Sequence, residues 1–249
     1  MLLRSLSKHV KDQNWFAVGL DFLIVVFGIF IGFQLNNWNE NRKLDEAYAQ
    51  ARVRLVSETE ANLAAARQLI AANEASLPVV RSAIDVLRSC ASGSNELKAL
   101  EFGLNLIRGT QSLKLRDTAL SALTRDDGLL SRQAEAERER LGEFQRALNR
   151  TQETLDFLER LPFDDLIEDH PFVGMGEVET LRLSDKDWDK VEYRRLSLVV
   201  PVSEACSDPS LVKQFYQWER VADFQVLRAR QFAANLEQNL EALGAGAAP

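Results

Sequence analysis

The longest apolar run of the chain extends from Trp15 to Leu35, and only Asp21 interrupts it. A helix of these 21 residues rises roughly 31 Å, enough to cross the hydrocarbon core of a bilayer. Trp15 and Trp38 bracket the run, and indole side chains favour the headgroup layer on either side of that core. The pattern therefore predicts a transmembrane helix over residues 15–35, preceded by a short tail over 1–14.

A cleaved signal peptide is the alternative interpretation of the same run. Signal cores are shorter, and a small-x-small cleavage site follows them. Here the run ends in the bulky side chains of Phe33 and Leu35, and Trp38 comes soon after it. We therefore expect the helix to stay in the protein as an uncleaved anchor.

Beyond the span, apolar residues recur at roughly helical spacing with charged and amide residues between them. The first long helix is expected to continue from the span to about residue 76, with Pro78 as a break or restart. The last helix is expected to begin at Asp208-Pro209, a cap followed by proline in the first turn. The predicted helices cover residues 39–76, 79–90, 95–108, 111–125, 129–161 and 209–243.

Residues 162–208 are expected to be the irregular part of the chain, because prolines and glycines are concentrated there. Ser184 and the acidic residues after it resemble a helix start, which favours a short helix over 185–197. The run from Leu196 to Val202 is instead compatible with an extended segment. Both interpretations stay open from the sequence alone.

Long helices with one apolar face must bury that face against each other in water. The pattern thus predicts a mainly α protein, in which an N-terminal transmembrane helix continues into an elongated antiparallel helical bundle domain over residues 36–243. With helices of more than 30 residues, this bundle would be some 50 Å long. Residues 244–249 are expected to form a flexible tail.

Composition agrees with a folded domain and argues against one class of partner. The apolar share is 46% and the charged share 27%, which suits a globular part rather than a disordered one. The net charge is −7, and nearly all of the negative balance lies after the span. An acidic domain lacks the basic field that phosphate contacts require, so nucleic acid is not an expected partner.

The basic residues around the span leave its orientation nearly balanced. Arg4, Lys8 and Lys11 precede it, and four basic residues follow it closely: Arg42, Lys43, Arg52 and Arg54. The positive-inside rule therefore gives little direction. Because a short basic tail before an apolar run resembles an uncleaved export signal, we expect a cytoplasmic N-terminus and a large periplasmic domain in a bacterial inner membrane.

The two cysteines, Cys90 and Cys206, lie in loop-like contexts. In an oxidising compartment they can form one disulfide, and otherwise they are two unrelated free thiols. No Cys or His spacing typical of a zinc site is present in the sequence.

The span itself carries a candidate helix-contact face. At 100° per residue, one face collects Asp21, Val25, Gly28, Gly32 and Leu35. Gly28 and Gly32 form a GxxxG spacing, which lets helix backbones approach closely in lipid. A carboxylate at Asp21 costs up to roughly 3 kcal/mol inside the span, so a partner that offers a donor would stabilise it. The alternative is that Asp21 reaches the inner interface and the glycines are incidental.

Other candidate chemistry is sparse. An acidic cluster is a weak candidate for a divalent cation, because it lacks the spacing of a calcium loop: Asp164, Asp165, Glu168 and Asp169. His170 has no evident nucleophile or orienting partner in the sequence. Several aromatic residues are more typical of a core or a groove than of a ligand site: Trp188, Tyr193, Tyr216 and Trp218.

Residues 18–40 resemble the opening of a bacterial family of uncharacterised single-pass membrane proteins. The similar elements are the Gly/Ile-rich span with Gly28-Ile-Phe-Ile-Gly32 and the segment Gln34-Leu-Asn-Asn-Trp-Asn-Glu40. Leu55-x-x-Glu58-x-x-x-Asn62-Leu63 is similar to the first long helix of that family. The likeness is weaker over 41–160 and absent after 162.

This chain also departs from the family at one point. Leu20 separates Gly19 from Asp21, where family members more often have an adjacent Gly-Glu pair. The resemblance implies an anchor and a helical domain, and it implies no activity, cofactor or catalytic residue.

Three functions compete on this basis. The first is a non-enzymatic scaffold or interaction module in the bacterial cell envelope, held in the bilayer as a homodimer or with another membrane protein. The second is an extracytoplasmic ligand-sensing bundle that signals through a partner, for which a pocket with convergent polar groups is expected around aromatic residues: Trp188, Tyr193, Phe215 or Trp218. The third is an enzyme, which needs a catalytic cluster that the sequence does not reveal.

Overall fold

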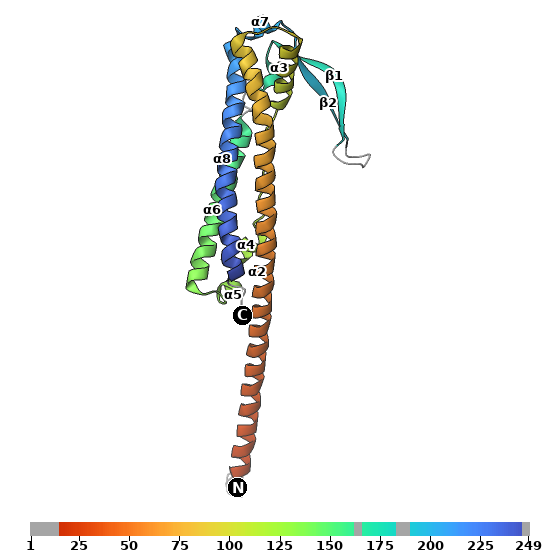
Figure 1. The fold of residues 1–249 in the computed structure, drawn as a ribbon. Helices are drawn as coiled ribbons and strands as arrows, with labels where there is room; N and C mark the ends of the chain where they lie inside the picture. The colour runs from red at the N-terminus through yellow and green to blue at the C-terminus, as the bar shows by residue number, and fades with distance from the viewer. Residues whose placement is uncertain (1–14, 162–165, 183–189, 246–249) are drawn as a thin grey trace.

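The computed structural model describes residues 15–161, 166–182 and 190–245. These residues form a mainly α protein in which one very long helix extends far beyond the bundle that it helps to build (Figure 1). The elements in chain order are α2 (Trp15–Ser89), α3 (Ser94–Leu106), α4 (Thr118–Arg125), α5 (Asp127–Leu130), α6 (Glu135–Arg160), η2 (Ile167–Asp169), β1 (Val173–Arg182), β2 (Lys190–Leu198), α7 (Val202–Ala205) and α8 (Pro209–Ala245).

Helix α2 is continuous over 75 residues and does not break at Pro78. The prediction of a new helix after Pro78 is therefore wrong. Proline removes one backbone hydrogen bond and leaves the carbonyl of Glu74 without its helical donor. Both Glu74 and Pro78 face solvent, where water can satisfy that carbonyl. On the opposite side, Leu77 and Val80 are buried in the core, and this packing holds the helix together.

The bundle consists of α2, α8 and α6, with α8 running antiparallel to α2 along most of its own length. Ion pairs between the two helices fix this direction, because residue numbers rise on α2 as they fall on α8. Arg67 lies 2.7 Å from Glu237, Arg230 pairs with Glu74, and Arg81 lies 2.6 Å from Glu219. The expected antiparallel bundle is thus present.

Residues 109–117, here called the strap, have no regular secondary structure. The predicted helix over 111–125 is correct only for α4. Side-chain amides from two helices hold the strap: Asn62 exchanges two hydrogen bonds of 2.8 Å with the backbone of Arg116, and Gln152 bonds Leu113 and Leu115 at 3.0 and 2.8 Å. Glu58 then accepts from the amide of Ala119 at the start of α4, at 2.8 Å.

The predicted helix over 129–161 is interrupted near its start. Asp126 accepts hydrogen bonds from the amides of Gly128 and Leu129 and so begins the four-residue helix α5. The chain then turns before α6 begins at Glu135. Helix α6 is 26 residues long, shorter than the sequence pattern suggested, because this turn takes its first residues.

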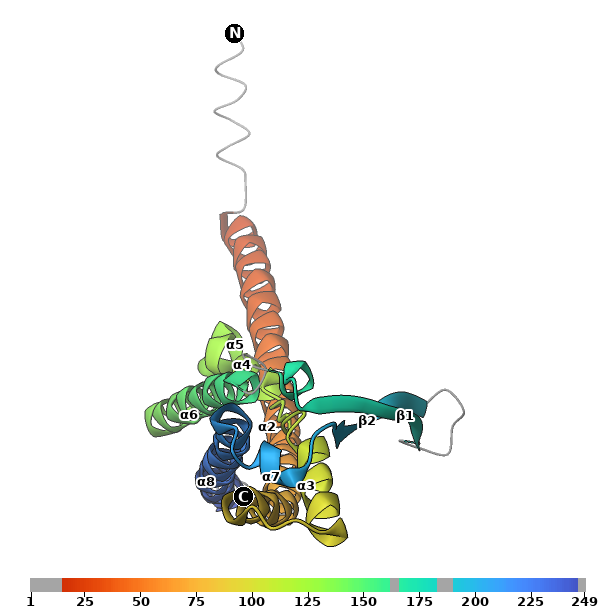
Figure 2. The same ribbon diagram turned by 90° about the horizontal axis from the view of Figure 1, so that it is seen from above.

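The segment expected to be irregular contains a β-hairpin. Strands β1 and β2 pair antiparallel, with a register irregularity between Met175 and Val178. The predicted helix over 185–197 is wrong from Lys190 onward, and its earlier part lies outside the described residues. The hairpin stands out sideways from the bundle (Figure 2). Asn105 of α3 holds its base through two 2.9 Å hydrogen bonds to the backbone of Leu196.

Two apolar cores fill the bundle, one toward the span and one toward the far end. Between them lies a buried polar layer, in which Asn73 donates to Gln225 at 3.0 Å and Gln225 donates to the carbonyl of Gln111 at 3.2 Å. Asn73 and Gln225 are each 1% exposed. Ile70 contacts both cores.

Candidate functional site

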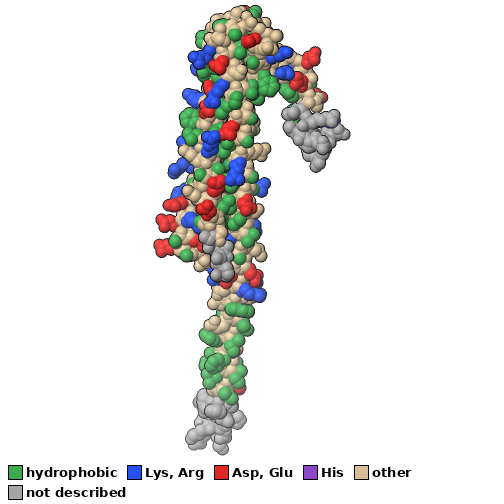
Figure 3. Space-filling view, viewed as in Figure 1, with side chains coloured by type: hydrophobic (Ala, Val, Ile, Leu, Met, Phe, Trp, Pro, Cys, Tyr) green, Lys and Arg blue, Asp and Glu red, His purple; other side chains and the backbone are tan. Residues whose placement is uncertain are grey.

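The first part of α2 is an apolar helix that no described part of the chain covers. An 18-residue window in this part of α2 has a mean hydropathy of 1.8, and none of that window is buried. Figure 3 shows hydrophobic side chains around the helix where it extends beyond the bundle. By length and composition, this helix can cross a membrane, and it is the single such helix among the described residues.

The predicted contact face lies wholly on this uncovered part. Val25 is 58% exposed and Leu35 is 60% exposed, and Asp21 also faces solvent. A methyl group added at Gly28 or Gly32 would meet no atom within 4 Å. The glycines are therefore not required by packing within one chain, which leaves their spacing available to another helix.

A polar neck follows the span. Trp38 is 64% exposed, and the guanidinium of Arg42 lies 5.8 Å from the centre of its ring. Side-chain hydrogen bonds one turn apart link Asn36 to Glu40 at 3.0 Å. An exposed indole stacked with a cation is typical of the water-facing edge of a membrane span. For Trp15 the structure places the residue in the first turn of α2.

A cluster of polar contacts locks the anchor helix into the bundle just beyond this neck. Tyr48 donates a 2.5 Å hydrogen bond to Glu137 of α6, and Arg52 lies 3.7 Å from the same carboxylate. Arg52 also donates to the carbonyl of Leu243 near the end of α8, at 3.2 Å. Burial and the carboxylate of Glu137 raise the pKa of the Tyr48 hydroxyl, so the hydroxyl keeps its proton and stays a donor.

At the far end of the bundle, Cys90 and Cys206 form a disulfide with an S–S distance of 2.00 Å. Cys90 follows the last residue of α2, and Cys206 follows α7 just before α8 begins. The backbone of Cys90 has a φ of 51°, a left-handed conformation that ends a helix. The bridge thus joins the ends of the two longest helices, at the pole opposite the span (Figure 1).

His170 has partners that the sequence did not reveal. Its Nε2 lies 2.8 Å from the hydroxyl of Ser210, and that hydroxyl donates to Asp208 at 2.7 Å. The amide of Phe172 donates to Nδ1 of His170 at 3.1 Å. Nδ1 is therefore an acceptor, the proton sits on Nε2, and Nε2 has no lone pair for the proton of Ser210.

This arrangement differs from a catalytic triad in its third contact. In a triad, the carboxylate holds Nδ1–H and the other ring nitrogen accepts the serine proton. Here the carboxylate of Asp208 holds the serine and also accepts from the amide of Leu211 at 3.0 Å. Together, these contacts cap α8 and tie it to the loop before β1.

The acidic cluster does not assemble among the described residues. Glu168 pairs with Arg108 at 2.9 Å, and Asp164 and Asp165 lie outside the described ranges. Over those ranges, no three His, Cys, Asp or Glu side chains come together in a way that could hold a metal ion.

The aromatic residues divide between core and surface. Phe215 and Trp218 are buried at 0% and 4% exposure, and the indole of Trp218 donates to the carbonyl of Gly109 at 2.8 Å. Tyr193 lies on the hairpin and donates to Glu179 at 2.9 Å, a bond that raises the pKa of the Tyr193 hydroxyl. Trp188 lies outside the described residues.

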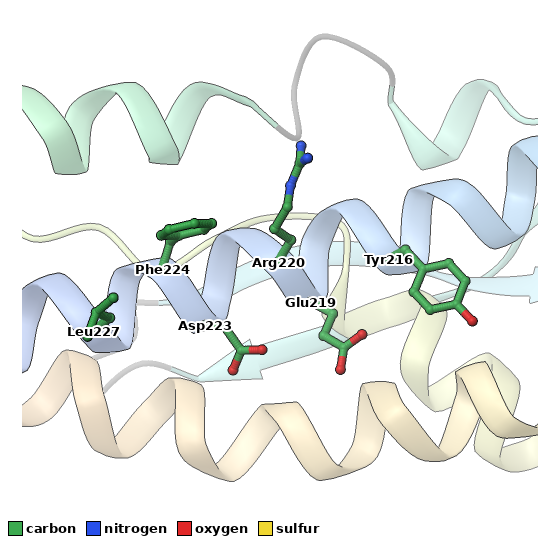
Figure 4. A pocket seen from close by; sticks show the side chains of 6 residues that line it. All are labelled: Tyr216, Glu219, Arg220, Asp223, Phe224 and Leu227. Carbon is green, nitrogen blue, oxygen red and sulfur yellow. The ribbon is translucent and has the colours of Figure 1, made fainter.

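A surface hollow of about 620 Å³ lies along α8 (Figure 4). The described residues that line it all belong to this one helix: Tyr216, Glu219, Arg220, Asp223, Phe224 and Leu227. Glu219 and Asp223 are turned toward Arg81 of α2, at 2.6 and 2.9 Å. The acidic groups of the hollow therefore pair with α2. Among the described residues that line it, polar groups from different elements do not converge.

No protein-family model, curated protein or solved structure matches this chain. The resemblance of residues 18–40 to a family of membrane proteins therefore stays a prediction from the sequence.

The structure does assign a role to two residues of the similar segment in the first long helix. Glu58 and Asn62 hold the start of α4 and the end of the strap. The sequence contains a signal for this role. A glutamate and an asparagine one turn apart, in a helix rich in alanine and leucine, indicate a contact with another segment.

Proposed function

We propose that this protein is a single-pass membrane-anchored scaffold or interaction module of the bacterial cell envelope, without catalytic activity. The observation that carries this proposal is the uncovered apolar helix, which continues without a break into the folded bundle. An apolar helix that nothing covers is unfavourable in water, whereas the hydrocarbon core of a bilayer solvates the whole of its apolar segment.

We place the large domain outside the cytoplasm and the N-terminus inside. The disulfide between Cys90 and Cys206 supports this orientation, because disulfides form and persist in oxidising compartments and are rare in the cytosol. The positive charges around the span are too evenly divided to decide the matter. A bacterial inner membrane with a periplasmic bundle fits this orientation.

The contact face of the span is the proposed site of assembly with a second copy or with another membrane protein. The same side of α2 continues along the bundle, at 100° per residue, through Val53, Ser57 and Ala64. Val53 is 71% exposed, and Ser57 and Ala64 also face solvent. A helix packed on the span could therefore follow α2 into the aqueous part without displacing any part of the bundle.

Sensing of a ligand has less support. It was expected to use a pocket around Phe215 or Trp218, and both side chains are in the core. The hollow on α8 is lined from one helix among the described residues, which gives a ligand few convergent contacts.

Sidedness is tested by protease treatment of intact spheroplasts that express the full chain. We expect the bundle to be digested from outside, with the protein otherwise extracted only by detergent. A control with permeabilised cells gives the total digestible fraction. A bundle protected in intact spheroplasts, or protein released by salt washing, would contradict the proposal.

Assembly is tested by cross-linking in native membranes. The triple variant Asp21→Leu, Gly28→Ile, Gly32→Ile fills the contact face and removes its carboxylate, so we expect loss of the cross-linked species. A matched variant on the opposite face, Leu23→Ile, Val26→Leu, Phe30→Leu, should cross-link as the parent does. Equal yields from both variants would rule out this face as an interface.

A further inference from the structure

The end of the bundle nearest the span lies close to the expected bilayer surface. We propose that a collar rests on the phosphate-bearing headgroups of the outer leaflet. It consists of Arg42 and Lys43 of α2 together with residues 128–131, which end α5 and begin the loop after it and are here called the turn. This inference rests on the proposed membrane anchoring. It adds a second contact with lipid that the span alone does not require.

The height of the collar follows from the unbroken helix. Trp38 marks the headgroup layer, and at 1.5 Å per residue Asn41 lies roughly 5 Å and Leu44 roughly 9 Å further along the axis. One headgroup layer is roughly 5–8 Å thick. Whatever packs on α2 beside residues 41–44 therefore lies at the outer edge of that layer.

This turn and the residue that follows it pack there. Arg132 donates to the carbonyl of Asn41 at 3.3 Å and lies 3.3 Å from the carboxylate of Asp45. A methyl group built on Gly128 would lie 3.0 Å from the side chain of Leu44. By contrast, α8 ends near Arg52, which bonds the carbonyl of Leu243. The turn thus lies closer to the span than the described end of α8 does.

The two cations of the collar lie on the sides of α2 that the turn leaves open. Successive residues of a helix are 100° apart, so Lys43 and Arg42 point progressively away from the direction of Leu44. Both face solvent. The carboxylate of Glu46 lies 3.9 Å from Arg42, and Arg42 also lies over the ring of Trp38. Long basic side chains next to a span reach lipid phosphates readily.

Contacts on both sides of α2 have a mechanical consequence. Single spans tilt by roughly 20° on average. A turn on one side and two cations on the other oppose tilting in either direction, so the collar holds the bundle upright.

The test uses the full chain in vesicles of phosphatidylcholine and phosphatidylglycerol. The sequence has no cysteine beyond the bridged pair, so single cysteines can be introduced and spin-labelled in the oxidised protein. Ser131→Cys reports on the collar, Phe27→Cys on the middle of the span, and Ser82→Cys on the exposed far part of α2. The readout is collision with a water-soluble nickel chelate, measured by electron paramagnetic resonance.

We expect the label at residue 27 to be inaccessible, and the label at 131 to collide roughly threefold less often than the label at 82, because a headgroup layer limits the chelate. If residue 131 collides as often as residue 82 while residue 27 is protected, the collar is wrong and the anchor stands. If residue 27 is accessible, the anchor itself is wrong, and the collar with it.

A charge variant tests the cationic half. Arg42→Gln with Lys43→Gln should raise the accessibility of the label at 131 toward that of residue 82. The matched control, Arg88→Gln with Lys98→Gln, removes the same charge at the far end and should leave it unchanged. No difference between the two double variants would overturn the role assigned to Arg42 and Lys43.

Discussion

At the scale of single residues, side-chain amides form the hydrogen bonds that backbone groups usually make within a sheet or a helix. Asn62, Gln152 and Asn105 each donate and accept hydrogen bonds with an irregular segment or a strand. Buried backbone groups without a partner cost free energy, typically 1–3 kcal/mol each. These amides let the strap and the hairpin base lie against helices at no such cost.

Asp208 is the residue at which pH should act most directly. Hydrogen bonds from Ser210 and from the amide of Leu211 lower the pKa of its carboxyl to about 2. A carboxyl with a lowered folded pKa stabilises the protein above its unfolded pKa and loses that contribution as the pH falls toward the folded value. This contribution should thus be complete at neutral pH and should decline as the pH falls below about 4.

Replacing that carboxylate gives the corresponding mutational prediction. Asp208→Ala removes the cap of α8 and the acceptor of Ser210, so the free energy of unfolding should fall by about 1–2 kcal/mol at pH 7. The measurement is urea unfolding at pH 7 and at pH 3. Glu241→Ala, at an exposed position of the same helix, is the control. A loss equally large at both pH values would show that the carboxylate charge is not the cause.

At the scale of elements, helices with a long apolar stripe could be predicted well from the sequence. Helix α8 begins at Pro209 as expected, because Asp208 caps it through local contacts. The break predicted at Pro78 is absent. The effect of a proline depends on whether the carbonyl left without a donor faces water and on how firmly the neighbouring residues are packed. Both conditions arise from tertiary structure.

The strap and the hairpin could not be predicted from the sequence for a different reason. Leu113 and Leu115 have a spacing that suits several backbone conformations, and the choice is made by Gln152, which comes much later in the chain. In β2, Val191 and Tyr193 are residues that favour strands, but their pairing partners lie on β1. Contacts between distant segments therefore decided what local propensity left open.

The polar layer between the two cores is open to a double-mutant test. Asn73→Leu alone should destabilise the bundle by about 1–3 kcal/mol, because the side-chain oxygen of Gln225 loses its donor in a buried site. Asn73→Leu with Gln225→Leu should recover most of that loss or more, since two apolar groups then meet. Chemical unfolding of both variants and of Gln225→Leu provides the cycle. A double variant as unstable as the sum of the single variants would mean that the two amides are not coupled.

At the scale of the whole molecule, the disulfide closes the end of the bundle that faces away from the span. It joins residues 116 positions apart in sequence, and a cross-link over a loop of that length restricts the unfolded chain strongly. Cys90→Ser with Cys206→Ser should lower the free energy of unfolding by about 2–4 kcal/mol. Adding a reductant to the parent should reproduce the loss and leave the variant unaffected. A reductant effect on the variant would point to another cause.

The uncovered apolar helix was the part of the candidate site that the sequence could predict best, because a bilayer requires a certain length and composition of any helix that crosses it. The contact face is different. Asp21, Gly28 and Gly32 can be placed on one side of α2 from the 100° rotation per residue, but the helix proposed to pack against them would belong to another molecule. Likewise, the pairing of Cys90 with Cys206 required the fold, since it depends on where α2 ends and α7 begins.

The unbroken course of α2 makes the molecule a spacer of set height. Its last residue, Ser89, stands roughly 80 Å beyond Leu35 at 1.5 Å per residue. If the protein is anchored as proposed, a molecule that contacts the far pole must extend about as far from the bilayer, and a neighbour with a shorter extracytoplasmic domain does not reach it. The length of α2 thus determines which neighbouring molecules can contact the far pole.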